Sequence, residues 1–302
     1  MNGAVAPATQ AEAELGITQG NRRKAIANGA FSAVIRLCLV VAIAALVALV
    51  SYVVSQGGSS FGPRLWQRFP SLNPRLAGAR SAVLGTVWVI SLTALIAVPV
   101  GVGAALYLEE FARKDRWYNR LIDINLQNLA AVPSIVYGIL GLAFIARGPL
   151  NLGPSILTGS LILALLVLPI IVIASREAIR AVPSTIRQAG LALGATEWQT
   201  VSRQVLPAAT PGIATAVILA LSRAIGEAAP LIMIGAFTYV PFEPKRLSDP
   251  FTVLPIQIFD WIGRPQDGFT KLAAAASLML LLILIAMNSI AILVRSRFQR
   301  HS

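Results

Sequence analysis

This chain of 302 residues has very little of the chemistry on which soluble enzymes depend. It contains one cysteine, Cys38, and one histidine, His301, so it offers no intrachain disulfide, no thiolate metal site and no imidazole site within a domain. No phosphate-binding loop of the form G-x-x-x-x-G-K-S/T occurs, so a signature for nucleotide hydrolysis is also absent. We therefore expect no catalytic residue, no metal and no cofactor in this chain.

Charge is scarce as well, and apolar residues are abundant. Charged residues make up 13% of the sequence and apolar residues 56%. A membrane-spanning helix needs about 20 mainly apolar residues, and six segments meet this requirement: 32–54, 81–108, 124–146, 155–175, 208–237 and 272–294. The net charge of +12 could suggest nucleic acid, but the basic residues are scattered in short loops without a basic stripe. The sequence predicts an all-α polytopic membrane protein, surrounded by lipid, with no nucleic-acid partner.

Three parts follow one another along the chain. Residues 1–30 are rich in Ala, Gln and Gly and predict a disordered, solvated cytoplasmic tail. Residues 31–55 predict the first transmembrane helix, which is long and starts late, so we expect an uncleaved anchor. Residues 81–294 predict the core transmembrane domain.

The basic residues also predict the orientation of the chain. An even number of spans puts both termini on one side of the membrane. The tail with the entry to the first span, the second loop, the insert at 176–207 and the C-terminus together carry 15 Lys and Arg, against 9 in the opposite loops. Cytoplasmic loops carry the excess of positive charge. Both termini and the insert are therefore expected in the cytoplasm.

The insert at 176–207 is polar and predicts two short amphipathic helices around a glycine. Pro183 suits the start of the first helix, Gly194 supplies its stop, and Thr196 with Gln199 fits a capping box that starts the second. Pro207 is expected to end the second helix. Such a hairpin is suited to docking with a component outside the membrane, and an ordinary interfacial helical hairpin is the alternative.

Two charged residues stand inside the fifth apolar segment. Arg223 and Glu227 are four residues apart, so on a helix they lie within pairing distance on one face. Each would cost about 2.5–3.5 kcal/mol or more if it faced lipid. We expect Pro230 to kink the helix near them. The pair is either a structural ion pair or part of a solute path, and a path in which Arg223 meets an oxyanion is favoured.

Two other groups have competing interpretations. Ser134 follows Pro133 within the third span, where a proline kink and a hydroxyl that lines a solute path are equally good explanations. The mixed-charge run at 109–116, which begins with Glu109 and Glu110, is interpreted as a solvated cytoplasmic face.

The insert contains Gln188-Ala189-Gly190, Gly194-Ala195-Thr196, Trp198-Gln199 and Val205-Leu206-Pro207. These residues resemble the cytoplasmic coupling loop of ABC-transporter permeases, although Gln188 stands where that pattern prefers Glu. Four further stretches lie at 99–101 with 107–112, at 128–138, at 222–231 and at 250–259. They resemble the phosphate permease family of the PstA type.

The resemblance implies a type I ABC importer permease of MetI-like architecture in a bacterial or archaeal cytoplasmic membrane. It implies a second related permease, two copies of a cytoplasmic ATPase that carries out the hydrolysis, and an extracytoplasmic phosphate-binding protein. The substrate path is expected at Ser134, Arg223 and Glu227. The ATPase contacts are expected at Gln188, Ala189, Gly190, Gly194, Ala195, Thr196 and Trp198.

Inorganic phosphate is the expected substrate, and another oxyanion such as sulfate or molybdate is the alternative within this class. Outside the class, an ATP-independent secondary carrier or a membrane scaffold or sensor remains open. Flux by this chain alone would indicate a carrier, whereas partner binding without flux would indicate a scaffold.

Overall fold

A computed structural model describes residues 8–113, 116–236 and 239–299. The chain divides into two compact units, residues 1–53 and 54–302, and each is described by itself. Helix α1 (Ala8–Gly57) forms the described part of the first unit and extends just into the second. Its stretch Asn28–Ser60 is long and apolar enough to cross a membrane. The helix begins at Ala8, in the segment where the sequence predicts a disordered tail, and residues 1–7 lie outside the described residues.

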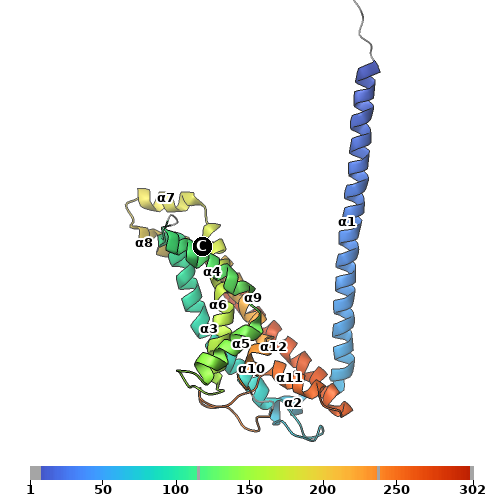
Figure 1. Cartoon of the computed structure of the whole chain (residues 1–302), viewed down its shortest axis with the longest axis vertical. Helices are drawn as coiled ribbons and strands as arrows, with labels where there is room; N and C mark the ends of the chain where they lie inside the picture. Colours follow the sequence, from blue (N-terminus) through green and yellow to red (C-terminus); the bar gives the residue numbers. More distant parts are fainter. Residues whose placement is uncertain (1–7, 114–115, 237–238, 300–302) are drawn as a thin grey trace, which may run out of the picture. The chain divides into compact units, whose positions relative to one another are not determined.

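The second unit is all helical over the residues that the structure describes (Figure 1). Several α-helices continue directly into a five-residue π-helical turn. The elements are a 3-10 turn (Gly58–Ser60), α2 (Pro63–Gln67), α3 (Arg80–Leu106) with a π-turn (Tyr107–Phe111), α4 (Trp117–Ala131), α5 (Ser134–Gly141) with a π-turn (Leu142–Ala146), α6 (Ile156–Arg180), α7 (Ser184–Ala192), α8 (Glu197–Thr200) with a π-turn (Val201–Val205), α9 (Leu206–Ile225), α10 (Ala229–Met233), α11 (Leu254–Ile262) and α12 (Asp267–Gln299).

Over the described residues, five helices are long and apolar enough to span a membrane, and a bent pair of helices raises the number to six if it is one span. The bent pair is α4 and α5, which meet at an angle of 101° where the sequence predicts one span. Pro133 has no N–H and holds Val132 extended, so the helix stops there. The Tyr137 hydroxyl donates to the carbonyl of Leu129, 2.8 Å away across the bend. A carbonyl near the end of α4 thereby gains a hydrogen bond from α5.

The fifth predicted span also has different ends. The helical run that contains α9 starts at Glu197, well before the expected start, and stops at Ile225. The prediction that Pro207 ends the preceding helix is wrong. A π-turn lies directly before it and changes the hydrogen-bond pattern where proline has no N–H to donate. At the other end, the break comes at Gly226, ahead of the predicted kink at Pro230, which starts α10 instead.

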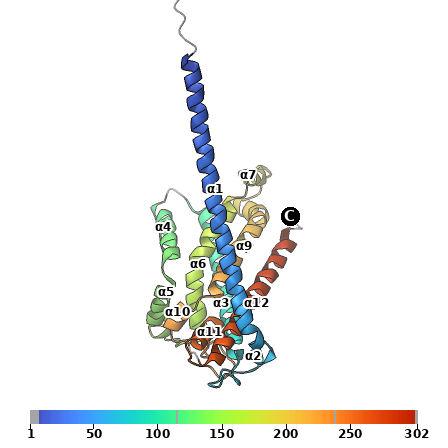
Figure 2. The ribbon, with the colours of Figure 1, turned by 90° about the vertical axis from the view of Figure 1, so that its right-hand side faces the viewer.

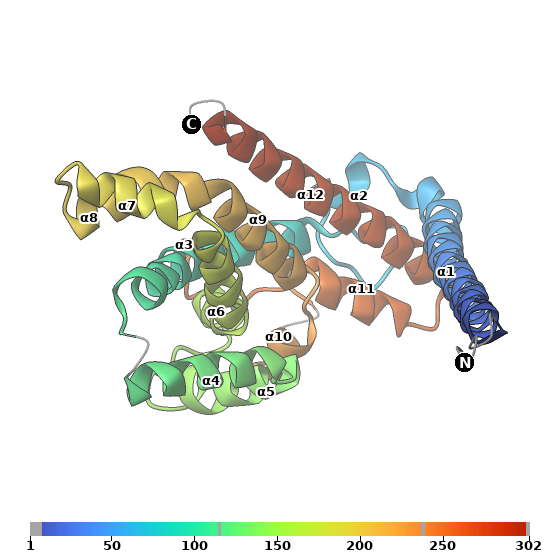
Figure 3. The same ribbon diagram turned by 90° about the horizontal axis from the view of Figure 1, so that it is seen from above.

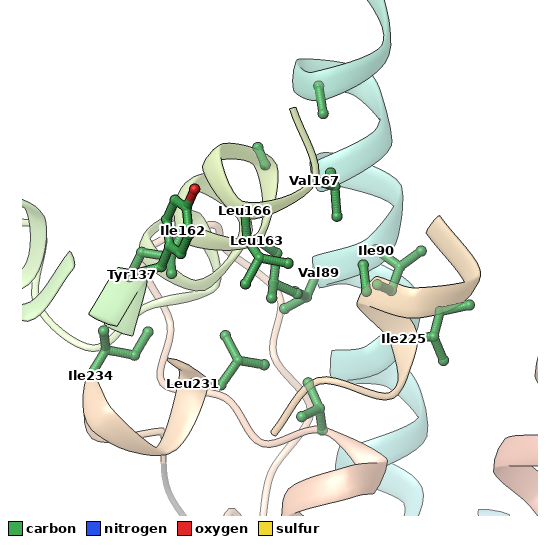
Figure 4. Close-up of a cluster of buried hydrophobic side chains, with 14 of the residues drawn as sticks. Val89, Ile90, Tyr137, Ile162, Leu163, Leu166, Val167, Ile225, Leu231 and Ile234 are labelled. Atoms are coloured by element: carbon green, nitrogen blue, oxygen red, sulfur yellow. The ribbon is translucent and has the colours of Figure 1, made fainter. Parts of the chain in front are cut away.

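Helices α3 and α6 form the centre of the second unit. A side chain at Gly101 would come within 2.7 Å of Ile171, so the two helices approach closely there. Near the middle, the Thr93 hydroxyl donates to the carbonyl of Ser160, and the Ser160 hydroxyl donates to that of Val89. Figure 4 shows the buried hydrophobic side chains that pack beside this pair, drawn from α3, α5, α6, α9 and the α10 region.

The second unit has two distinct ends. Helices α7 and α8 lie at one end, and α2 and α11 lie at the other, in two perpendicular views (Figures 1 and 2). A smaller buried cluster that contains Leu65, Trp261 and Phe269 holds α2, α11 and the start of α12 together at the far end. The coupling hairpin expected from the sequence is therefore separated from this cluster by the length of the central helices.

Candidate translocation path and coupling hairpin

The intramembrane charges lie at the end of a helix. Arg223 is in the last turn of α9, and Glu227 follows the helix end at Gly226. Arg223 Nε lies 3.4 Å from Glu227 Oε1, so the ion pair expected from the sequence forms. The Arg223 side chain is 53% exposed in this chain, and that of Glu227 is 19% exposed. A cation in the last turn of a helix also interacts favourably with the helix dipole. The pair forms across a helix break and not along one continuous helix.

A second break lies against the first. If Gly138 on α5 carried a Cβ atom, that atom would lie 2.7 Å from Pro230 Cα and 2.8 Å from Met233 Cβ on α10. The bend between α4 and α5 is therefore packed next to the break between α9 and α10. Non-helical backbone at membrane depth is tolerated only inside protein or beside water. Two adjoining breaks indicate a polar, protein-lined region within the membrane.

Ser134, the third predicted path residue, belongs to the second of these breaks. It is the first residue of α5, one turn before Gly138, and it is half-buried. Within the described residues, no hydrogen bond or ion pair joins Ser134 to Arg223 or Glu227. The packing of α5 on α10 places Ser134 in the same region, with no direct contact to the charged pair.

Sequence reasoning missed one polar residue in this region. Asn288 lies in the apolar stretch of α12 and accepts a hydrogen bond of 2.7 Å from the hydroxyl of Ser222. The contact ties α12 to α9 at the residue next to Arg223. An amide within an otherwise apolar span was the available signal, because a buried amide in a membrane needs hydrogen-bond partners.

The coupling hairpin consists of α7, a turn and α8, and it forms as predicted. Gly194 has a φ of +84°, a left-handed conformation that favours glycine. The Thr196 side chain accepts from the Gln199 N–H at 3.2 Å, and the Gln199 side chain accepts from the Thr196 N–H at 2.9 Å. This is the expected capping box. A Cβ at Gly190 would come within 2.8 Å of the Thr200 side chain, so this glycine lets the two short helices meet.

The hairpin presents a largely uncovered surface (Figure 3). Gln188 and Ala189 on α7 are exposed, as is Trp198 on α8, while Ala195 is half-buried. The side chain of Leu193, in the turn, is 89% exposed. Large apolar side chains that stand free at a helix turn are typical of protein contact surfaces.

The C-terminal end of α3 corrects one expectation. The run at 109–116 is predicted as a solvated face, but the side chains of Glu109 and Glu110 are only 4% and 9% exposed. Glu109 accepts from Arg180 at 2.9 and 3.1 Å and from Arg176 at 3.4 Å. Arg176 also pairs with Asp123 on α4, and Arg180 with Glu177 at 3.0 Å. Arg113 and Arg116 are exposed, and residues 114 and 115 lie outside the described residues.

Glu110 contacts the hairpin itself. Arg187 of α7 lies 2.6 Å from Glu110 Oε1 through Nη2 and donates through Nε to both carboxylate oxygens at 3.1 Å. Arg187 donates as well to the carbonyls of Val182 and Ile179 at the end of α6. The hydrogen bond to Glu110 raises the pKa of Arg187 above its ordinary value. A buried carboxylate needs a partner, and two adjacent acids at the end of an apolar segment were the signal for this network.

The part of the chain that the structure describes has no candidate metal-binding site. No group of three or more His, Cys, Asp or Glu side chains there could hold a metal ion.

Residues 97–299 match the family of binding-protein-dependent transport system inner membrane components. The chain belongs to this family. The matched region starts within α3 and contains the two helix breaks, the hairpin and the Glu109–Glu110 network. Membership makes the chain a multi-pass permease component of the inner membrane that works with a substrate-binding protein and, as in ABC transporters, an ATPase.

Among curated relatives, a probable ABC transporter permease protein, YqgH of Bacillus subtilis, is 34% identical over 236 residues, which cover 73% of this chain and 76% of the relative. The phosphate transport system permease protein PstA of Mycobacterium leprae is 31% identical and covers 86% of each chain. PstA 1 of Mycobacterium tuberculosis H37Rv is 32% identical over 72% of this chain and 70% of its own length.

Solved structures of ABC importers share the fold. An inward-facing MetNI methionine ABC transporter chain superposes with a TM-score of 0.59 at 16% identity, over 72% of this chain and 96% of its own. A bacterial alginate ABC transporter chain superposes with a TM-score of 0.54, also at 16% identity, over 70% and 76%. The fold is therefore that of the MetI-like importer permeases, as predicted.

Proposed function

We propose that this chain is a permease subunit of an ATP-driven importer of inorganic phosphate, that it forms half of the translocation path, and that ATP is hydrolysed on a separate chain. The observation that carries the proposal is the position of Arg223, half exposed at the break of a membrane-spanning helix. A guanidinium offers several N–H donors in a fixed plane that matches an oxyanion. The relatives named as phosphate permeases support phosphate over other oxyanions.

Glu227 gives Arg223 a partner when no anion is present. Their contact of 3.4 Å is loose for a charge-assisted hydrogen bond, which is usually about 2.7–2.9 Å. An arriving anion can therefore take the place of the carboxylate without breaking a short, bidentate pair of hydrogen bonds. Ser134, from the adjoining break, supplies a hydroxyl to the same region of the path. In this proposal Arg223 binds the passing anion, and after the anion is released Glu227 pairs with Arg223 again.

A second permease is needed to complete the path. Arg223 and Leu219 are both exposed on α9, and a guanidinium that faces lipid within the membrane is energetically costly. A related permease that covers this face removes the cost and encloses the anion between two chains. We propose such a heterodimer.

The coupling hairpin is the proposed docking site for one of two copies of a cytoplasmic ATPase. The second copy docks on the related permease. Leu193 and Trp198 are exposed apolar side chains that a groove in the ATPase can cover, and Gln188, Ala189, Gly190, Gly194, Ala195 and Thr196 give the hairpin its shape. The hairpin and both termini are then cytoplasmic, and the opposite end, with α2 and α11, meets the extracytoplasmic phosphate-binding protein. Reporter domains fused to either terminus test this orientation.

The test is uptake of labelled phosphate into vesicles that contain the complete assembly, with and without this subunit. We expect nucleotide-dependent uptake that requires the subunit and that arsenate inhibits more strongly than sulfate. Stronger inhibition by sulfate would assign a different oxyanion. Equal uptake without the ATPase would identify a secondary carrier and refute the proposal.

A further inference from the structure

The π-turn at the inner end of α3 is in contact with both halves of the coupling hairpin. Its Glu110 pairs with Arg187 of α7. The centre of its Phe111 ring lies 6.1 Å from the centre of the Trp198 ring on α8. The hairpin is joined to α6 in sequence only through the short segment around Pro183. The α8 half of the hairpin continues directly into the helical run that contains α9, whereas the α7 half follows α6 only through this segment. Side chains of α3 therefore hold α7 where the backbone alone would let it pivot.

Arg187 connects three elements through one side chain. It lies on α7, its guanidinium binds Glu110 of α3, and it donates at 2.7 Å to Val182 O and at 2.9 Å to Ile179 O at the end of α6. Val182 lies beyond the end of α6 at Arg180 and is followed by a proline, while the Ile179 carbonyl also accepts from the Val182 N–H at 3.2 Å in the turn that ends the helix. The planar guanidinium can serve a carboxylate and two carbonyls together, whereas an ammonium cannot hold this planar arrangement.

Glu109 fastens the same end of α3 to α6. Arg180 grips its carboxylate with two nitrogens, and Arg176 approaches it from one turn earlier on α6. The side chains of Glu109 and Glu110 are nearly dry, so each carboxylate depends on its arginines for compensation. The two acids therefore bind adjacent elements, Glu109 binding α6 and Glu110 binding α7.

Movement of this joint would be carried along the whole bundle. Helices α3 and α6 are in close contact at Gly101. Near the middle of α3, the Thr93 hydroxyl donates to Ser160 O and the Ser160 hydroxyl donates to Val89 O. At the hairpin end of α6, Gly212 of α9 packs on Ala178, where a Cβ would come within 2.7 Å. Helix α9 then runs to Ile225 and carries Arg223 in its last turn. A displacement of the hairpin thus has a packed route to the proposed anion site.

We propose that Glu110 and Arg187, together with Glu109 and its arginines, are positioning residues for the coupling of ATP hydrolysis to transport. They make the hairpin move with the inner ends of α3 and α6 as one body, so that force from the ATPase moves the helices and does not merely bend the segment around Pro183. This inference rests on the proposed function, because it takes the hairpin as the ATPase contact.

The test measures phosphate uptake and ATP hydrolysis together in vesicles that contain the complete assembly and the binding protein. In Glu110→Gln the side-chain size is kept and the charge is lost. The matched control is Glu177→Gln, because Glu177 also pairs with an arginine but its side chain is 63% exposed. We expect Glu110→Gln to lower phosphate transported per ATP hydrolysed at least about tenfold. The control should stay within about twofold of the parent, since surface ion pairs contribute little.

Two further variants separate positioning from simple instability. The exchange Glu110→Arg with Arg187→Glu restores opposite charges and should recover part of the coupling, and Arg187→Lys, which keeps the charge but loses the planar fork, should assemble and couple less well than the parent. A Glu110→Gln assembly with the coupling ratio of the control would overturn the proposal. If Glu110→Gln and the exchange both fail to assemble, Arg187→Lys decides, and a parental ratio in that variant would overturn it.

The same measurements distinguish failure of the proposed function from failure of the positioning role. If the parental assembly shows no nucleotide-dependent phosphate uptake, the proposed function is wrong. If the parent transports phosphate and the Glu110 and Arg187 variants keep its ratio of uptake to hydrolysis, only the positioning role is wrong.

Discussion

Substitution of Gly138 by alanine tests whether the two helix breaks must stay in close contact. The added Cβ would lie 2.7 Å from Pro230 Cα and 2.8 Å from both Met233 Cβ and Pro230 O. Ordinary contact begins at 3.4 Å, so α5 and α10 must separate by about 0.7 Å. Backbone atoms cannot rotate away as a flexible side chain could. Overpacking of this kind typically costs about 1–3 kcal/mol.

That cost predicts two measurable effects. The midpoint of thermal inactivation should fall by about 2–12 °C, at about 2–4 °C for each kcal/mol in a domain of this size class. If only the close-packed geometry transports phosphate, the variant must spend about 1–3 kcal/mol to reach it. The fraction of molecules in that geometry, and with it the rate of uptake, then falls about 5- to 150-fold at 25 °C.

The matched control is Gly103→Ala. Gly103 lies in α3 with no atom of this chain within 4 Å of its added Cβ, and alanine favours a helix by about 0.5–1 kcal/mol over glycine. The control should therefore be as stable as the parent or slightly more so. Equal thermal stability and equal uptake in the two variants would refute the inference that contact between the breaks determines the path.

Three other changes test separate parts of the path and the hairpin. Arg223→Gln should abolish phosphate uptake while membrane insertion and assembly, measured by fluorescence-detected size exclusion, stay at the parental level; normal uptake would remove Arg223 from the path. Gly194→Val adds a β-branched side chain at a φ of +84°, which costs about 1–2 kcal/mol or more, and should lower uptake per ATP hydrolysed, whereas an unchanged ratio contradicts the hairpin's role. Tyr137→Phe removes the hydrogen bond across the bend and should lower the thermal midpoint by an amount equivalent to about 0.5–1.5 kcal/mol; no shift would show that the bend is held by packing alone.

The hairpin was predictable because local chemistry determines it. A glycine at the required left-handed position and a capping box are short-range signals, and both Gly194 and the Thr196–Gln199 pair adopt the expected geometry. Apolar length likewise placed most of the spanning helices, since it measures how much backbone must be hydrogen-bonded within the lipid. Features of this kind depend on a few neighbouring residues and can be recognised in the sequence.

The helix breaks and the acidic network were not predictable in the same way. Pro133 predicted a kink within 124–146 as one of two interpretations, but the apolar length of the segment still predicted one span, and only the structure shows that the chain turns through 101° there. The run at 109–116 looks solvated because its partners, Arg176, Arg180 and Arg187, are more than 60 residues away in sequence. Only the folded chain shows that a distant arginine compensates each acid.

Two groups of charges in this membrane domain differ in burial and in distance, and the packed helices α3, α6 and α9 connect them. At the C-terminal end of α3, Glu109 binds α6 and Glu110 binds the hairpin. At the breaks, Arg223 is loosely paired with Glu227. The tight, buried network suits transmission of force, because several charge-assisted hydrogen bonds must break before its parts can separate. The loose, half-exposed pair suits exchange of partners with a passing anion. The difference in burial and distance between the two sets of charges is therefore what a chain needs if it is driven at one end and handles an anion at the other.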